Sequence, residues 1–278
     1  MKFGLHGINF GPYSSPQIIR DVAQAAETAG FDSLWTGEHI VLPEKGGFLP
    51  ARTPHLDSIV ALTYVAAATK TLKLATGVII LPQHNPLLLA KQIASLDVLS
   101  GGRVLAGFGV GWLRPEFQAL GVSFEDRGAR ADAYLQAMQA IWSQERPTYH
   151  SRFSSFEDVQ AYPRPLQQPS PPILIGGSSL PALYRTVKYA HGWFASETTP
   201  ENLSHSLSTI RQLEQEGVRP EALGALEISM YVGGSITPEA IERLAERGVH
   251  RLVLALPLKA SRETSLRFIE HVSKTLLP

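Results

Sequence analysis

The chain has 278 residues, a length typical of one (β/α)8 barrel, which needs roughly 250 residues, and we expect a single domain over residues 1–278. Lysine and arginine together number 25, as do aspartate and glutamate, so the formal net charge is zero. A chain without excess positive charge has no electrostatic attraction for nucleic acid or an anionic membrane surface. We therefore expect small-molecule partners. There is no cysteine, which excludes disulfides, thiolate nucleophiles and cysteine metal sites.

The N-terminal residues lack the apolar stretch of a signal peptide, and no apolar run approaches the roughly 18 residues of a membrane span. Together with the missing cysteine, this predicts a cytoplasmic protein.

Four segments open with a serine, threonine or asparagine followed by proline and close with glycine. They cover residues 15–30, 85–101, 199–217 and 237–248. The polar residue caps a free helix N–H, proline fits the first turn, and glycine accepts a left-handed conformation after the last turn. Each segment is therefore predicted to be a helix.

Short apolar segments between the helical patterns are predicted to be strands. They are Lys2–Ile8, Ser33–Thr36, Lys73–Gly77, Val104–Gly109, Pro172–Gly176, Trp193–Ala195, Glu227–Val232 and Arg251–Leu256. Eight strands that alternate with helices predict a parallel (β/α)8 TIM barrel. An open doubly wound sheet is the alternative, but its dinucleotide fingerprint is missing, because Trp112 stands where the third glycine is required.

Two connections are longer than a barrel needs, at residues 37–55 after strand two and 143–171 before strand five. We expect both to be insertions. The first follows a strand and so belongs at the C-terminal face, where barrel active sites lie.

Residues 72–86 begin with a predicted strand, a helix follows, and residues 100–112 contain the next strand. Glycine stands at the end of both strands. Apolar runs of this kind are typical of parallel strands buried on both faces, and a glycine at the strand end lets a flat molecule approach the backbone. At these residues the chain resembles the bacterial luciferase-like family of flavin and deazaflavin oxidoreductases. The resemblance is greatest to the branch that uses the deazaflavin coenzyme F-420.

The resemblance implies a non-proline cis peptide at Gly77-Val78 that supports one face of the cofactor ring. It implies a phosphate site where a strand meets the helix that starts near Pro181, which is also a place where glycine N–H groups and serine hydroxyls can bind an anion. The cofactor-binding residues that we expect are Glu38, Thr76, Gly77, Val78, Gly107, Gly109, Gly176, Gly177 and Ser178.

Gly37-Glu38-His39 follows strand two at the predicted mouth of the barrel. A histidine there can exchange protons near neutral pH, and the resemblance makes His39 the catalytic residue. Resembling deazaflavin enzymes usually carry aspartate before this histidine, and glutamate at position 38 adds one methylene group to that side chain. A plain surface-loop histidine is the alternative.

Three residues are expected in the substrate pocket, namely Trp35, Trp112 and His84. Trp35 is equally credible as a core residue. Glu116, four residues after Trp112, is an acid without an assigned role. No His-x-His pattern is present, so no metal site is expected.

The sequence thus predicts a coenzyme F-420-dependent oxidoreductase that transfers hydride between the cofactor and a small organic substrate. An FMN-dependent monooxygenase of the same family, which uses reduced flavin and oxygen, is the alternative. A barrel that binds a ligand without catalysis is the third reading. Homodimerisation stays open at this point.

Overall fold

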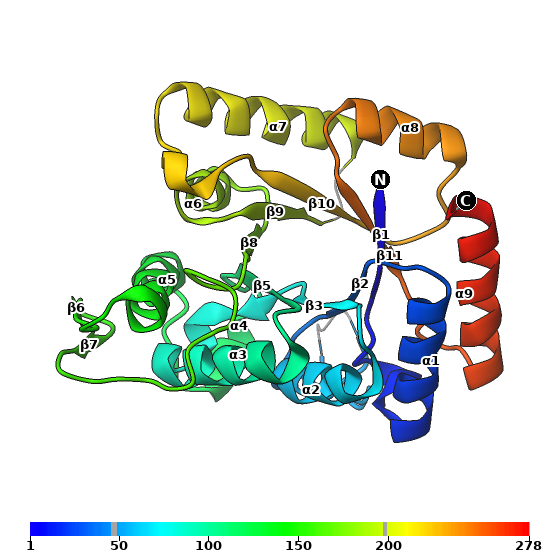
Figure 1. The fold of residues 1–278 in the computed structure, drawn as a ribbon, viewed down its shortest axis with the longest axis horizontal. Helices are drawn as coiled ribbons and strands as arrows, with labels where there is room; N and C mark the ends of the chain where they lie inside the picture. The colour runs from blue at the N-terminus through cyan, green and yellow to red at the C-terminus, as the bar shows by residue number, and fades with distance from the viewer. Residues whose placement is uncertain (46–48, 197–198, 278) are drawn as a thin grey trace.

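The computed structural model describes residues 1–45, 49–196 and 199–277, and its central feature is a closed ring of parallel strands. Helices surround the ring on all sides (Figure 1). The strands of the ring are β1 (Lys2–His6), β2 (Ser33–Thr36), β3 (Lys73–Thr76), β4 (Ile79–Ile80), β5 (Val104–Gly109), β8 (Ile173–Gly176), β9 (Gly192–Ala195), β10 (Glu227–Val232) and β11 (Arg251–Ala255).

The ring closes through β1, which pairs with both β2 and β11, and through β5, which pairs with β3, β4 and β8. Every pair in the ring is parallel. The predicted (β/α)8 barrel is therefore confirmed, with one correction. The third strand is interrupted, so that β3 and β4 lie on either side of the cis peptide bond between Gly77 and Val78.

The helices are α1 (Pro16–Thr28), α2 (Ser58–Ala68), α3 (Pro86–Ser100), α4 (Arg114–Ala119), α5 (Arg127–Ser143), α6 (Leu180–Tyr189), α7 (Pro200–Gln215), α8 (Pro238–Glu246) and α9 (Arg262–Leu276), with short 3-10 turns at Gly11–Ser14, Leu81–Gln83 and Glu221–Leu223. The four predicted helices are present. Asn85, Thr199 and Thr237 accept backbone N–H groups as predicted caps, whereas Ser15 makes no such bond.

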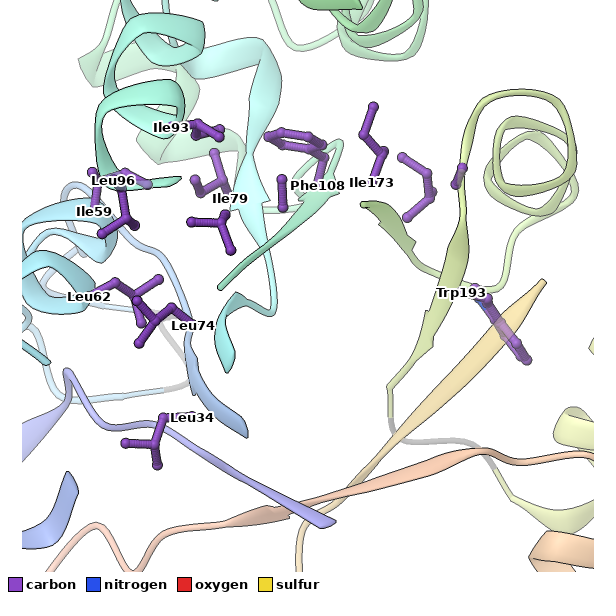
Figure 2. Close-up of a cluster of buried hydrophobic side chains, with 14 of the residues drawn as sticks. Leu34, Ile59, Leu62, Leu74, Ile79, Ile93, Leu96, Phe108, Ile173 and Trp193 are labelled. Atoms are coloured by element: carbon purple, nitrogen blue, oxygen red, sulfur yellow. The ribbon is translucent and has the colours of Figure 1, made fainter. Parts of the chain in front are cut away.

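Apolar side chains fill the layer between the outer face of the strands and the helices. Figure 2 shows strand residues of this layer, among them Leu34, Leu74 and Phe108, together with Ile59 and Leu62 of α2 and Ile93 and Leu96 of α3. These side chains are all at most 8% exposed. Because both faces of a parallel strand are covered in this way, the strands read as continuous apolar runs in the sequence.

The barrel interior is closed by a second cluster and, nearer the strand starts, by a buried arginine. Trp35 stacks on Phe194 with ring centroids 5.0 Å apart, and both belong to the inner cluster with Leu105, Leu174 and Val253. Arg251 donates to Asp32 at 2.8 Å and Ser229 at 3.0 Å and also pairs with Glu227. The axis is thus a packed core, and a ligand site is left at the strand ends.

The insertion before strand five lies away from the strand ends. It contains an antiparallel hairpin of β6 (Tyr149–His150) and β7 (Ser155–Phe156). Gln167 ties it to the body of the barrel, because its side chain and backbone N–H groups both donate to the buried carboxylate of Asp97 in α3.

A side-chain contact joins the third strand to β5 at the interruption. The hydroxyl of Thr76 accepts the N–H of Gly107 and donates to its carbonyl oxygen, both at 2.8 Å. A Cβ atom at position 107 would overlap the carbonyl oxygen of Thr76. Gly107 is therefore required by the packing of the barrel wall.

We expect Gly107→Ala to lower the free energy of unfolding by about 3 kcal/mol, because a methyl group has no space beside this backbone. Gly128→Ala in α5 is the matched control. Its Cβ would meet only the Arg185 guanidinium, at 3.7 Å, and alanine favours a helix by about 1 kcal/mol. Urea denaturation of the three proteins measures both effects, and equal stability of the two variants would contradict this account of Gly107.

Candidate functional site at the barrel mouth

A cavity of about 920 Å³ lies at the C-terminal ends of the strands. Its wall near the barrel axis includes residues from β1, from the loop after β2, from the interruption between β3 and β4, and from the ends of β5 and β8. Of the residues expected in the site, those that line the cavity are Glu38, His39, Gly77, Val78, Gly109, Trp112, Gly176 and Gly177.

Val78 forms the floor of the cavity with three glycines. A Cβ atom at Gly109 would lie 2.7 Å from Val78 Cγ2, and one at Gly176 would lie 2.9 Å from Val78 Cγ1. At Gly77 it would lie 2.9 Å from the Trp35 ring. The glycines thus make room for Val78 and Trp35, and this part of the cavity wall consists of glycine main chain and the Val78 side chain. Such a surface fits one face of a planar ring system.

His39 is held by a buried carboxylate. Its Nδ1 lies 2.9 Å from Oε2 of Glu116, whose other oxygen accepts the backbone N–H groups of Ile40 at 2.6 Å and Val41 at 3.3 Å. The Glu116 side chain is fully buried and that of His39 is 8% exposed. Glu116 comes from α4, which follows β5, and so holds the loop after β2 to that part of the chain.

The pKa of Glu116 lies below its ordinary value. Burial alone would raise it, but the hydrogen bond and charge of His39 and the two backbone N–H groups together lower it. Glu116 is thus a carboxylate at neutral pH and acts as a hydrogen-bond acceptor.

Glu38 is held in a different way. Its Oε2 accepts the N–H of Ile80 at 2.6 Å and lies 3.0 Å from Nε2 of His84. Burial lowers the pKa of His84, but the hydrogen bond and charge of Glu38 and the charge of Asp57 more than offset this and leave it raised. Glu38 therefore joins the loop after β2 to the residues that follow β4.

His6 fixes the interruption of the third strand from inside the barrel. Its Nε2 lies 2.8 Å from the carbonyl oxygen of Gly77. Burial lowers the pKa of His6 to about 4, although the bond to Gly77 opposes the shift. At neutral pH the ring is uncharged, so Nε2 carries the proton and donates to Gly77.

Asn9 determines where the loop after β2 starts. This fully buried residue donates to the carbonyl oxygens of Gly37 and Leu56, both at 2.8 Å, and accepts the N–H of Gly37 at 3.2 Å. The two ends of the insertion are thereby held together, and Glu38 and His39 follow at a defined point.

Five predicted site residues do not line the cavity. Trp35 is fully buried in the barrel interior, with its indole N–H bonded to Ser33, so its assignment to the substrate pocket is corrected to the core reading. Thr76 and Gly107 bind each other in the wall, as described above. His84 contacts Glu38 behind the wall, and Ser178 lies exposed at the start of α6.

Three residues of the site, His6, Glu116 and Asn9, were not assigned roles from the sequence. Asn9 stands between the apolar Ile8 and Phe10 just after β1, and a polar residue between buried apolar residues indicates a buried hydrogen-bonding role. Glu116 lies 77 positions from His39, and the pairing depends on how the two loops meet in space.

The described part of the chain contains no group of three or more histidine, cysteine, aspartate or glutamate side chains that could hold a metal ion. Within the same residues, no helix combines the length and the apolar character that crossing a bilayer demands.

The sequence model of a family described as luciferase-like monooxygenases matches residues 4–273. The chain belongs to this family. Its members are oxidoreductases or monooxygenases.

An uncharacterised protein of Mycobacterium tuberculosis (strain ATCC 25618 / H37Rv) is 31% identical over 268 residues, which are 91% of this chain and 92% of that protein. An FMNH(2)-dependent dimethylsulfone monooxygenase of Pseudomonas putida is 31% identical over 195 residues, 69% of this chain. The matched part is 52% of the monooxygenase, so this chain spans about half of it.

Among solved structures, an F420-dependent secondary alcohol dehydrogenase in complex with an F420-acetone adduct superposes with a TM-score of 0.81. The match covers 99% of this chain and 98% of the dehydrogenase at 16% identity, which shows a shared fold.

Acidification should destabilise the protein through its buried histidines. His6 and His55 both have a pKa lowered to about 4, His55 through burial and the nearby charge of His39. Below pH 6.5 the unfolded chain binds protons on these residues before the folded chain does, so the free energy of unfolding falls as the pH drops toward 4. For His6 alone the loss between pH 7 and pH 4.5 is roughly 2 to 3 kcal/mol.

Urea denaturation of wild type and His6→Gln at the two pH values tests this effect. The variant should lose roughly 2 to 3 kcal/mol less than wild type on acidification. His205→Gln, at an exposed position of α7, serves as the control and should follow wild type. If wild type and His6→Gln lost the same unfolding free energy between the two pH values, His6 would not be the residue responsible for the acid sensitivity.

Proposed function

We propose that this protein is a coenzyme F-420-dependent oxidoreductase that moves hydride between a deazaflavin ring and an alcohol or carbonyl carbon of a small organic substrate. The observation that carries the proposal is a histidine, paired with a buried carboxylate, that lines the same cavity as Val78 and the glycines around it. A bound deazaflavin would supply or take up the hydride at this floor.

A side chain of the protein must accept or donate the proton that accompanies hydride transfer. An alcohol that loses hydride from its carbon also loses the proton of its hydroxyl group, and a base within hydrogen-bonding reach has to take it. His39 is that base in our proposal. Glu116 is bonded to Nδ1 and so holds the ring in one orientation. In the reducing direction His39 returns the proton to the carbonyl oxygen.

The ring would be supported by Gly77, Val78, Gly109 and Gly176. Glu38 would hold the edge of the cavity in place by accepting the N–H of Ile80. Gly176, Gly177 and Ser178 precede α6, whose first N–H groups have no partner in the helix itself. We propose that this turn binds the cofactor phosphate. Gly177 has a φ of +105°, and Trp193 donates to its carbonyl oxygen at 2.8 Å, so the turn is held in place.

An FMN-dependent monooxygenase is the second candidate, and one feature of the cavity favours it. Among the lining residues that the structure describes there is no lysine or arginine, and Glu38 is the one acidic side chain. The deazaflavin coenzyme carries an acidic tail that basic residues would stabilise, whereas FMN ends at its phosphate. Arg127 and Arg130, which could have served the tail, instead contact Gly111 and Asp126.

Replacing His39 by alanine should lower kcat by roughly 10²- to 10⁴-fold while leaving cofactor affinity nearly unchanged, since the histidine supplies a proton path and little binding surface. Glu116→Gln should lower the same constant by roughly tenfold to a hundredfold, because the amide still accepts the N–H groups of Ile40 and Val41 but no longer carries the charge that orients His39. Steady-state kinetics and a cofactor titration measure the two effects, with His205→Ala as the control. Wild-type turnover in His39→Ala would contradict the role of His39 as the base.

The two cofactors differ in their reaction with oxygen, which gives a direct test. A deazaflavin has carbon at the ring position where flavin has nitrogen, and its reduced form reacts poorly with oxygen. We expect the protein to bind reduced F-420 with saturable quenching of tryptophan fluorescence and to consume no oxygen during turnover. Tighter binding of reduced FMN, with one oxygen molecule consumed for each reduced flavin, would establish the monooxygenase instead.

A further inference from the structure

The ring of a second histidine, His55, packs against the ring of His39. The two rings meet edge-on, with centroids 6.2 Å apart and planes at 88°, which is a favourable geometry for an aromatic pair. Both ring nitrogens of His55 are buried. His39 lines the cavity, whereas His55 is not among the lining residues that the structure describes. His55 therefore contacts His39 from the protein side rather than from the side that a ligand would occupy.

The main chain holds His55 in this place. Its two neighbours in the sequence pair with the segment that follows β1. The N–H of Gly11 donates to the carbonyl oxygen of Pro54 at 2.9 Å, and the N–H of Leu56 donates to the carbonyl oxygen of Asn9 at 3.0 Å. The position of residue 55 is thus fixed by backbone bonds, and a change of its side chain should leave the backbone where it is.

Phe10 lies against the ring of His55, with ring centroids 4.0 Å apart. The same phenyl ring lies over the main chain of Gly37, where a Cβ atom would be only 2.5 Å from Cζ of Phe10. Gly37 stands two positions before His39. Phe10 is therefore in contact both with His55 and with the start of the loop that carries His39.

The ring of His55 places no charge beside His39 at neutral pH. Burial and the nearby charge of His39 lower the pKa of His55 to about 4, although the backbone of Thr53 and the charge of Glu116 oppose the shift. The ring of His39 thus has a carboxylate at Nδ1 and an uncharged ring at its edge.

We propose that His55 is a positioning residue for His39, and that its ring holds the His39 ring against Glu116 and keeps water away from the hydrogen bond between them. The proposal rests on the proposed function for the role of His39 as the base, and on the ring contacts for the shielding. The side chain of His39 is 8% exposed, although the next residue, Ile40, is 44% exposed. Such positioning affects the rate, because a catalytic group misplaced by about 1 Å can lower turnover about 100-fold.

The proton on Nδ1 of His39 reports the shielding directly. A proton that is held between an imidazole and a carboxylate and protected from water gives a downfield NMR resonance, and its loss in His39→Ala assigns it. The measurement is the rate at which this proton exchanges with water in the cofactor-free protein at neutral pH. We expect roughly tenfold faster exchange in His55→Ala, because water enters the space of the ring, and a rate close to wild type in His55→Phe, which keeps an uncharged ring.

Phe10→Leu tests the same contact without changing His55. It removes the ring that lies against His55 and should also speed the exchange. His205→Ala, at an exposed position of α7, is the control and should keep the wild-type rate. Thermal unfolding checks that each variant is folded. Wild-type exchange in folded His55→Ala or in folded Phe10→Leu would overturn the proposal, and so would the absence of a protected resonance from the wild-type protein.

Turnover separates positioning from simple packing. His55→Ala should lower kcat roughly tenfold to a hundredfold with little change in cofactor affinity, and His55→Phe should restore most of the loss. Equal kcat values in His55→Ala and wild type would count against the positioning role.

The exchange measurement uses no redox cofactor, so its outcome is separable from the proposed function. A protein that turns over F-420 but shows the same exchange rate in every variant keeps the function and loses the role of His55. A protein that shows the expected exchange rates but binds neither F-420 nor FMN keeps the shielding by His55 and loses the function.

Discussion

The arrangement of the site depends on one buried carboxylate. Glu116 is removed from water on α4, and it is stable there because three groups of the loop after β2 donate to or pair with it. An unpartnered charge in the same place would be costly. The loop is therefore held to α4 by the need to satisfy that charge, and His39 takes its orientation from the same contact.

The interrupted third strand is the second constraint. A strand that stops after Thr76 and restarts at Ile79 leaves backbone groups without their regular ladder partners, and neighbouring residues bind them instead. Thr76 uses its hydroxyl on Gly107, and the carbonyl of Gly77 accepts from His6. The interruption brings Val78 to the cavity floor, so the same residues that complete the barrel wall also shape the surface on which a ligand would lie.

Much of the fold could be predicted from the sequence because it depends on local signals. The Ser/Thr/Asn-Pro starts, the glycine stops at residues 30, 101, 217 and 248, all with positive φ, and the apolar strands between them define βα units one at a time. The split of the third strand into β3 and β4 was anticipated only in part, since the cis bond at Gly77-Val78 came from the family resemblance.

The site was less predictable, because its contacts join distant parts of the chain. His39 and Gly77 were placed at the barrel mouth by their position at strand ends, and Val78 was assigned to the site through the family resemblance. Glycines 107 and 109 look alike in the sequence, yet the first faces Thr76 in the wall and the second faces the cavity. Only the three-dimensional packing distinguishes a glycine required by the wall from one that borders a ligand.

The plug of the barrel axis has a kinetic consequence. Arg251, Trp35 and Phe194 close the cylinder below the mouth, so nothing reaches the floor from beneath. In the function that we propose, a planar cofactor on Val78 and the substrate would both arrive through the mouth, and the bound substrate would cover the exposed face of the ring. The two would then enter in a fixed order and leave in the reverse order, because the lower molecule is trapped while the upper one remains.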